Sequence, residues 1–395
     1  MTAAGAVLDR EVRFGPHQYT FHVRPPGSWE GLAGQAADLH ADNFGLVYDA
    51  GLPAHLVKTV AECLAATAAP IAYFEVPASE RAKTPATGHE AEQAMLAAGF
   101  TRRSVVVALG GGLAGNVAGY AAHHIFRGVR LVHIPTTLLA MLDSTLSLKQ
   151  GLNWVRDNVI VGKNVLGAFH APTWVWCDLG FLDTLPAGQI TAALGELCKN
   201  VLAIAPQRYD WALARLRPDG DYTPAQIVEF INFCVTAKQS IMRHDPEEHG
   251  QGLRNEYGHT AGHALEAVTG GQIPHGDAVA RGVLVAAQVA RNAGYLDAAA
   301  VEAHWRLLAA NDLRRPVIPP GVPTGAIINA IRGDNKRGYH GDRPGCAPMV
   351  LLDALGQPHL ATYPAPAGGE TVSLLTQVPF DDVATAIDQL RDGQS

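Results

Sequence analysis

Three histidines stand close together between residues 256 and 276 of this chain. His259 and His263 are four residues apart, so on a helix they would lie on one face, one turn above the other. His275 follows a Gly-Gly break at 270–271, which can return the chain toward the same place. Neutral imidazole is a common ligand for zinc and similar ions, and it titrates nearest to pH 7. Metal binding and proton transfer are therefore the chemistries to consider.

Three interpretations of the histidine pair compete. The first is a pair of solvated or capped helix histidines with no chemical role. The second is a metalloprotease-like helix with both histidines on zinc, which needs a Glu directly after the first His, whereas Thr260 stands there. The third gives one histidine to a metal and the other to proton transfer, with further ligands from elsewhere. The return of the chain at Pro274-His275-Gly276 favours the third.

An anionic ligand is offered upstream by Glu196, which lies three residues before Lys199 on a predicted helix. An exposed pair of this kind would contribute little to stability. The flanking sequence, ITAALGELCKNVLAIA, is apolar, so we expect the pair to be buried. Glu196 with His259 and His275 would form a His₂Glu set with positions left for substrate oxygens, as in catalytic rather than structural sites.

Two further stretches carry polar or glycine residues next to predicted strands. Residues 110–116, GGGLAGN, follow a predicted strand at 104–109, and such a loop lets backbone amides approach a pyrophosphate. It does not follow the first strand, and no acid stands about twenty residues on, so a tight turn of small residues is an alternative. Lys149 and Lys163, with Asp143 and Asn164, favour a small polyoxygenated or phosphorylated ligand.

The composition excludes several classes of protein. With 395 residues the chain can form two domains, and 48% hydrophobic with 17% charged residues is typical of a globular protein. A net charge of −7 gives no basic surface for nucleic acid or an anionic membrane. The five cysteines show no C-x-x-C spacing, and the sequence has no membrane span or signal peptide, so we expect a cytoplasmic protein.

These residues must be positioned by an alternation of strands and helices. A hairpin is predicted at 11–24, and buried strands at 45–49, 71–76, 104–109, 131–134 and 174–177, with helices at 56–68 and 88–98. The alternation predicts an α/β fold with a parallel sheet. From Ala187 onward the pattern is helical. We therefore expect a parallel-sheet domain at 1–186 and a mostly α-helical domain at 187–395.

Taken together, the motifs resemble those of the sugar phosphate cyclases, the dehydroquinate synthase superfamily, from about Leu46 to Tyr339. The resemblance rests on GGGLAGNVAGY, FRGVRLVHIPTTLLAMLDS, GKNVLGAF, GELCKN, and YGHTAGHALE with HG twelve residues after its second histidine. It implies an enzyme that uses NAD and one divalent metal ion, Zn2+ or Co2+. The first domain would bind NAD, and the second would bind metal and a small-molecule sugar phosphate.

The resemblance also implies roles for individual residues. The metal would be held by Glu196, His259 and His275, and catalysis would involve His263, Glu256, Lys149 and Asp143. Substrate would be bound by Arg127, Asp143, Lys149, Asn164, Lys199, Lys238 and Lys336. NAD would be bound by Asp49, Glu80, Lys83, Gly111, Gly112, Asn116, Thr136, Thr137, Lys163, Thr184, Leu185 and Gln189. Because Arg127 would reach the substrate of a neighbouring subunit, a homodimer is implied.

Two departures from the family pattern indicate which substrate to expect. Dehydroquinate synthases begin the histidine motif with Asn and carry an Arg four residues earlier, whereas Glu256 and Gly252 stand at those places here. The dehydroquinate synthase substrate carries a carboxylate, which calls for cationic partners. EYGHT together with residues 334–339 resembles the branch that cyclises glucose 6-phosphate on the way to aminoglycosides. There NAD+ is regenerated, and Glu256 would act as the general base.

Two other functions remain possible on the sequence. One is dehydroquinate synthase itself, and the other is a metal-dependent NAD polyol dehydrogenase of the glycerol dehydrogenase type, which shares a two-domain plan and a histidine pair. One feature departs from the resemblance: the segment at residues 153–161 is several residues longer than expected between the Lys149 and Lys163 motifs, so the resemblance does not define the exact edge of the pocket.

Overall fold

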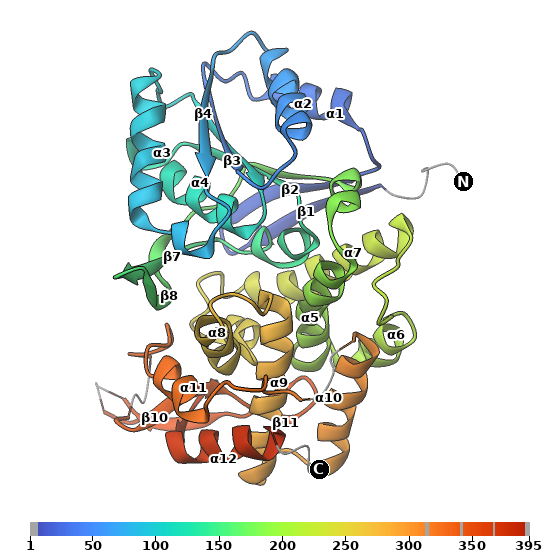
Figure 1. The fold of residues 1–395 in the computed structure, drawn as a ribbon, viewed down its shortest axis with the longest axis vertical. Helices are drawn as coiled ribbons and strands as arrows, with labels where there is room; N and C mark the ends of the chain where they lie inside the picture. Colours follow the sequence, from blue (N-terminus) through green and yellow to red (C-terminus); the bar gives the residue numbers. More distant parts are fainter. Residues whose placement is uncertain (1–6, 313–315, 340–342, 366–367, 392–395) are drawn as a thin grey trace. The chain divides into compact units, whose positions relative to one another are not determined.

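The computed structural model describes residues 7–312, 316–339, 343–365 and 368–391 (Figure 1). The chain divides into two compact units, Met1–Leu185 with Tyr222–Val235, and Pro186–Asp221 with Thr236–Ser395. The domain boundary expected after Pro186 lies next to the first of these divisions.

The first unit is built on a seven-stranded sheet in the order β1-β2-β9-β6-β5-β3-β4. Its strands are β1 Leu8–Phe14, β2 His17–Arg24, β3 Phe44–Asp49, β4 Ile71–Val76, β5 Val105–Gly110, β6 Arg130–Pro135 and β9 Trp174–Asp178. The first two pair antiparallel as a hairpin, and all other neighbours are parallel. The predicted hairpin, the five predicted strands and the parallel α/β class are confirmed.

Helices cover both faces of this sheet, which is why its central strands are apolar throughout. The helices are α1 Trp29–Asp38, α2 Ala54–Ala65, α3 Pro85–Ala97 and α4 Gly112–His124. Successive residues of a strand point to opposite faces. Val105 and Val107 of β5 therefore pack in the core that includes residues of α1 and α2, whereas Val106 and Ala108 pack in the core of α3 and α4. A strand buried on both sides appears as a continuous hydrophobic run.

The order of the sheet reverses between β3 and β5. From β3 the chain moves outward to β4, and it then returns to form β5 on the other side of β3. In open parallel sheets, ligands bind outside the carboxyl ends of the strands at such a reversal. Asp49 ends β3 and Gly110 ends β5, so both lie at this place.

The long segment noted between Lys149 and Lys163 belongs to a separate two-stranded hairpin. Its strands are β7 Lys149–Arg156 and β8 Val159–Phe169, paired antiparallel. Asp157 and Asn158 form the connection with φ values of 51° and 61°. Positive φ at both central residues is the requirement of a type I′ turn, and Asp and Asn tolerate it better than most residues. The additional residues are therefore accommodated in a hairpin whose register shifts between Leu152 and Val155.

The second unit is mainly helical, as expected. Its helices are α5 Ala187–Ala203, α6 Tyr209–Leu213, α8 His259–Val268, α9 His275–Asn292, α10 Ala298–Ala310, α11 Thr324–Ile331 and α12 Phe380–Arg391, while α7 Pro224–Met242 contributes to both units. Short antiparallel strand pairs, which were not predicted, join β10 Cys346–Val350 to β15 Leu375–Pro379, β11 Leu352–Ala354 to β12 Gln357–Pro358, and β13 Ala361–Pro364 to β14 Glu370–Ser373. Across the described ranges, no helix is long and apolar enough to span a bilayer.

Candidate active site

Close helix contacts at glycines position the three residues expected to bind metal. A Cβ added to Gly276 at the start of α9 would lie 1.9 Å from the carbonyl oxygen of Ala192 in α5. A Cβ added to Gly195 would lie 2.2 Å from the carbonyl oxygen of Gly276. Only glycine permits this approach, and the neighbours of these two glycines are Glu196 and His275. The backbone contact therefore brings the two side chains together.

His259 is positioned in the same way from α8. It follows Gly258, which has a φ of 79° and whose added Cβ would lie 2.6 Å from Val283 of α9. His259 and His263 lie one turn apart on α8, with ring centroids separated by 5.1 Å, as their spacing predicted.

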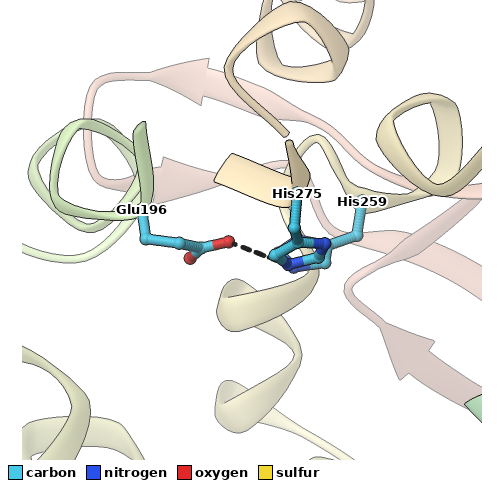
Figure 2. Close-up of side chains that lie close together, drawn as sticks. All are labelled: Glu196, His259 and His275. Atoms are coloured by element: carbon cyan, nitrogen blue, oxygen red, sulfur yellow. Dashed lines mark ion pairs between the residues drawn. The ribbon is translucent and has the colours of Figure 1, made fainter. Parts of the chain in front are cut away.

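Glu196, His259 and His275 form a cluster with the spacing of a metal site, and their side chains converge in Figure 2. Oε1 of Glu196 lies 3.4 Å from Nε2 of His259 and 3.5 Å from Nε2 of His275. These distances exceed those of ordinary N–H···O hydrogen bonds. They match the edge of a tetrahedron around zinc, about 3.4 Å for metal–ligand bonds of about 2.1 Å. The donor set and its geometry thus fit a divalent cation.

The protonation states of these groups suit metal binding. Glu196 is fully buried, which by itself would raise its pKa, but Nζ of Lys199 lies 2.6 Å from Oε2 and holds the pKa well below its ordinary value. Burial lowers the pKa of His259 to about 4, and the charge of Lys199 contributes in the same direction. At neutral pH the carboxyl group is therefore ionised and the imidazole of His259 is neutral, the forms that coordinate metal. The expectation that Glu196 and Lys199 form a buried pair is confirmed.

The second nitrogen of each cluster histidine has its own partner. Nδ1 of His259 lies 3.3 Å from the carbonyl oxygen of Tyr257, and Nδ1 of His275 lies 3.0 Å from Oε2 of Glu266. Tyr257 is itself fixed, because its hydroxyl lies 2.9 Å from Nε2 of the buried His304. Such contacts orient the rings so that Nε2 faces the metal. Neither Glu266 nor His304 was identified from the sequence.

His263 lies outside the cluster and contacts a different group of charges. Its Nδ1 is 4.0 Å from Oδ2 of Asp334, and Oδ1 of Asp334 lies 2.8 Å from Nζ of Lys336. Lys336 also lies 3.3 Å from Oε2 of Glu256. Burial would lower the pKa of Lys336, but the two carboxylates raise it, so the lysine is charged. Burial lowers the pKa of His263 well below its ordinary value, and His259 and the Lys336 charge add to this. The two helix histidines therefore face different groups, His259 the Glu196 carboxylate and His263 the Asp334 carboxylate, and their separate roles stay a prediction.

Residues expected to bind NAD gather at the reversal of the sheet in the first unit. A Cβ on Gly110 would lie 3.1 Å from Cβ of Asp49, and one on Gly111 would lie 3.2 Å from Thr137. The backbone N–H of Thr136 donates to the carbonyl of Gly110 at 3.0 Å. Helix α4 begins at Gly112, so its first N–H groups point toward this place. The glycine loop is thus a strand-to-helix turn at the carboxyl edge of the sheet.

A second group of predicted residues is held together by Asn153 of β7. Its Nδ2 donates to Oε1 of Glu80 at 2.9 Å, and its Oδ1 accepts the backbone N–H of Asn164 at 3.0 Å. Lys83 donates to Oδ1 of Asn164 at 2.8 Å, and Lys163 lies 3.6 Å from Oε1 of Glu80. Asn153 is fully buried, and it was not identified as a functional residue from the sequence. The only feature of the sequence that could have indicated its importance is its place as a polar residue between Leu152 and Trp154 in a strand.

The remaining predicted residues are dispersed in the chain. In the first unit, the side-chain oxygen of Asn116 accepts a hydrogen bond from the backbone N–H of Gly151, and Asp143 lies in a π-helical turn. Lys149 begins β7, and Arg127 has a φ of 64°. Thr184 and Leu185 follow β9. In the second unit, Gln189 lies in α5, Lys238 is buried on α7, and Lys199 donates to the carbonyl of Asn255 at 2.7 Å. Their roles toward NAD and substrate stay predictions.

Comparison with known proteins agrees with the motifs. Residues 73–192 match the 3-dehydroquinate synthase N-terminal family and residues 193–337 its C-terminal family. The chain is 40% identical to a 2-deoxy-scyllo-inosose synthase from Streptoalloteichus tenebrarius over 93% of this chain and 95% of that protein. A solved 2-deoxy-scyllo-inosose synthase, complexed with carbaglucose-6-phosphate, NAD+ and Co2+, is 31% identical with a TM-score of 0.84, covering 98% and 99% of the two chains. A probable glycerol dehydrogenase from Sinorhizobium meliloti 1021, 18% identical with a TM-score of 0.57 over 93% and 95%, shares the fold.

Proposed function

The chain belongs to the 3-dehydroquinate synthase family, and on that basis we propose that it acts as a 2-deoxy-scyllo-inosose synthase. It would convert D-glucose 6-phosphate into a carbocyclic ketone with elimination of phosphate, a carbon–oxygen lyase reaction of aminoglycoside biosynthesis. The observation that carries this proposal is the 40% identity to such a synthase over 93% of the chain. The glycerol dehydrogenase shares only the fold, at 18% identity.

The residues present fit both cofactors of this reaction. Glu196, His259 and His275 would hold the divalent metal, Co2+ or Zn2+, because their facing atoms have the spacing of its ligands. Asp49, the Gly110–Gly112 loop and Thr137 would receive NAD+ at the reversal of the sheet. When bound, the metal would polarise substrate oxygens and NAD+ would take up and later return a hydride.

Glu256 is suited to accept a proton from the sugar, and we assign this proton to carbon C5. It lies at the end of a short turn, Gln251–Glu256, and is 8% exposed. Lys336, 3.3 Å away, stabilises the ionised form of the carboxylate, and a general base must be ionised to act. His263, on the other side of the Asp334–Lys336 pair, would move a second proton during the reaction.

The surroundings of residue 252 support a neutral sugar as substrate. Dehydroquinate synthases carry an Arg at this place, where a cation would bind the substrate carboxylate. Here a Cβ on Gly252 would lie 2.7 Å from the carbonyl oxygen of Asp245 and 2.8 Å from its Oδ2, so there is no room for a side chain. Oδ2 of Asp245 accepts the backbone N–H of Gly252 at 2.7 Å. A substrate carboxylate would therefore find no cation at residue 252, and the charge of Lys336 is already paired with Glu256 and Asp334.

The proposal includes a homodimer and a cytoplasmic location. The first rests on the predicted role of Arg127 toward a neighbouring subunit. The second rests on the cysteine pattern of the sequence, and none of the five cysteines, all of which lie in the described ranges, forms a disulfide.

Incubation of the metal-loaded protein and NAD+ with glucose 6-phosphate tests the function. We expect release of inorganic phosphate, formation of a carbocyclic ketone and no net NADH. Robust turnover of the dehydroquinate synthase substrate would instead identify that enzyme, and stoichiometric NADH with a polyol would identify a dehydrogenase. Glu256→Gln should bind the sugar phosphate but release phosphate at least about 100-fold more slowly, because an amide cannot accept the proton.

A further inference from the structure

Glu266 contacts the candidate metal site through His275. Its Oε2 lies 3.0 Å from Nδ1 of His275, while Nε2 of the same ring faces Glu196. If Nε2 binds a cation, Nδ1 carries the ring hydrogen and donates it to Glu266. His259 differs, because its Nδ1 faces the neutral backbone carbonyl of Tyr257 at 3.3 Å. Nδ1 of His275 therefore faces a carboxylate, whereas Nδ1 of His259 faces a neutral carbonyl.

The position of Glu266 follows from the helix geometry. His259, His263 and Glu266 are spaced at i, i+4 and i+7 on α8, so they share one face. This face meets α9 across the close contact at Gly262, whose added Cβ would lie 3.0 Å from the carbonyl oxygen of Ala278. Glu266 is 8% exposed, so its carboxylate has lost most of its contact with water. Burial of this kind requires a compensating partner.

The charges around the cluster give the carboxylate a specific consequence. Lys199 lies 2.6 Å from Oε2 of Glu196 and neutralises the one anionic member of the cluster. With neutral histidines, these four side chains carry no net charge, which is a poor environment for a divalent cation. Glu266 adds one negative charge to this group through its contact with His275. The carboxylate also increases the electron density at Nε2 by accepting the Nδ1 hydrogen.

We propose that Glu266 is a positioning residue that sets the affinity of the cluster for its divalent metal by orienting and polarising His275. The alternative is a buried pair that only joins α8 to α9. That structural role would change the stability of the metal-free protein but not the dissociation constant of the metal. The inference rests on the metal-binding part of the proposed function and on no assignment of substrate.

The experiment uses the full chain stripped of metal and titrated with Co2+ or Zn2+ alone against a chromophoric chelator. Glu266→Gln keeps an acceptor for Nδ1 and removes the charge, whereas Glu266→Met removes both at similar length. We expect affinity to fall about 10-fold for Gln and about 100-fold for Met, the range for loss of such a contact. Glu302→Gln, the same change at an exposed position on α10, is the matched control and should bind like the unmodified chain.

The results separate the possible roles. If the dissociation constant of the metal for Glu266→Gln is within threefold of that for the unmodified chain, the proposal is overturned. This holds even if the metal-free variant unfolds at a lower temperature, because that result alone indicates a purely structural role. Glu266→Asp keeps the charge, so it should bind metal more tightly than Gln, and the reverse order also overturns the proposal. Because no sugar or NAD is present, failure to turn over glucose 6-phosphate would reject the proposed function and leave this result intact.

Discussion

Replacement of Gly276 by Ala tests whether the helix contact at α5 and α9 builds the metal site. The added Cβ would lie 1.9 Å from the carbonyl oxygen of Ala192 and 2.9 Å from its carbon. Because C···O contacts in proteins rarely fall below about 3.3 Å, the start of α9 must move by about 1.4 Å. This displacement acts on His275, the neighbouring residue, whose Nε2 is 3.5 Å from Glu196.

The expected losses follow from that displacement. Overpacking of a tight contact costs about 1–3 kcal/mol of unfolding free energy. A misplacement of about 1 Å in a catalytic group costs about 100-fold in rate, and we expect a loss of that order in turnover together with weaker metal binding.

The assay compares Co2+ affinity, phosphate release and thermal unfolding of the metal-free protein. Gly188→Ala in the same helix α5 is the control, because no atom lies within 4 Å of its added Cβ. We expect this control to be neutral or to gain up to about 1 kcal/mol of stability from helix propensity. A Gly276→Ala variant with unchanged metal affinity and unfolding temperature would refute the reasoning.

Three further predictions follow from the described contacts. His263→Ala should keep its metal and release phosphate from glucose 6-phosphate about 10²–10⁴-fold more slowly, whereas His275→Ala should lose its metal. Metal analysis of the two purified variants tests this, and a metal-free His263→Ala would be inconsistent with separate roles for the two histidines. Asn153→Ala should weaken NAD+ binding, measured by titration, because Glu80 and Asn164 lose their common partner, while the exposed Asn292→Ala should not. His133 and His304 have pKa values lowered to about 4 by burial, so the unfolded chain binds more protons between pH 4 and 6.5. The contribution of these two histidines to the unfolding free energy should therefore be constant above about pH 6.5 and fall below it, by up to about 1.4 kcal/mol per pH unit per histidine, and His304→Gln should reduce that slope.

The sheet could be predicted because its strands are buried on both faces, which makes each a short apolar run between turn residues. The hairpin β7–β8 was harder to recognise, because its strands mix lysines, glycines and exposed Trp154 and Leu166. Its Asp157-Asn158 turn was the local signal, and it has weaker preference for a type I′ turn than Asn-Gly. The same strand carries Asn153, whose importance depends on long-range contacts.

Two members of the candidate metal cluster, Glu196 and His259, could be predicted because they stand in helices at spacings from Lys199 and His263 that put them on definite faces. The partners of those residues could not. Glu266 lies in the same motif, but only the packing of α8 on α9 shows that it faces His275 rather than solvent. Lys336 was predicted to contact substrate, and its ion pairs with Asp334 and Glu256 could not be derived from spacing across eighty residues.

The two buried lysines resolve a conflict in the requirements of this site. A divalent cation needs carboxylates, whereas a sugar phosphate carries negative charge and would be repelled by unpaired ones. Glu196 has Lys199 at 2.6 Å, and Glu256 has Lys336 at 3.3 Å, so each ionised acid carries a local countercharge. Each pair keeps its carboxylate ionised, for metal coordination in one case and for proton removal in the other. Removing either lysine would leave a buried carboxylate without its partner, which favours protonation and disables the role that the acid would perform.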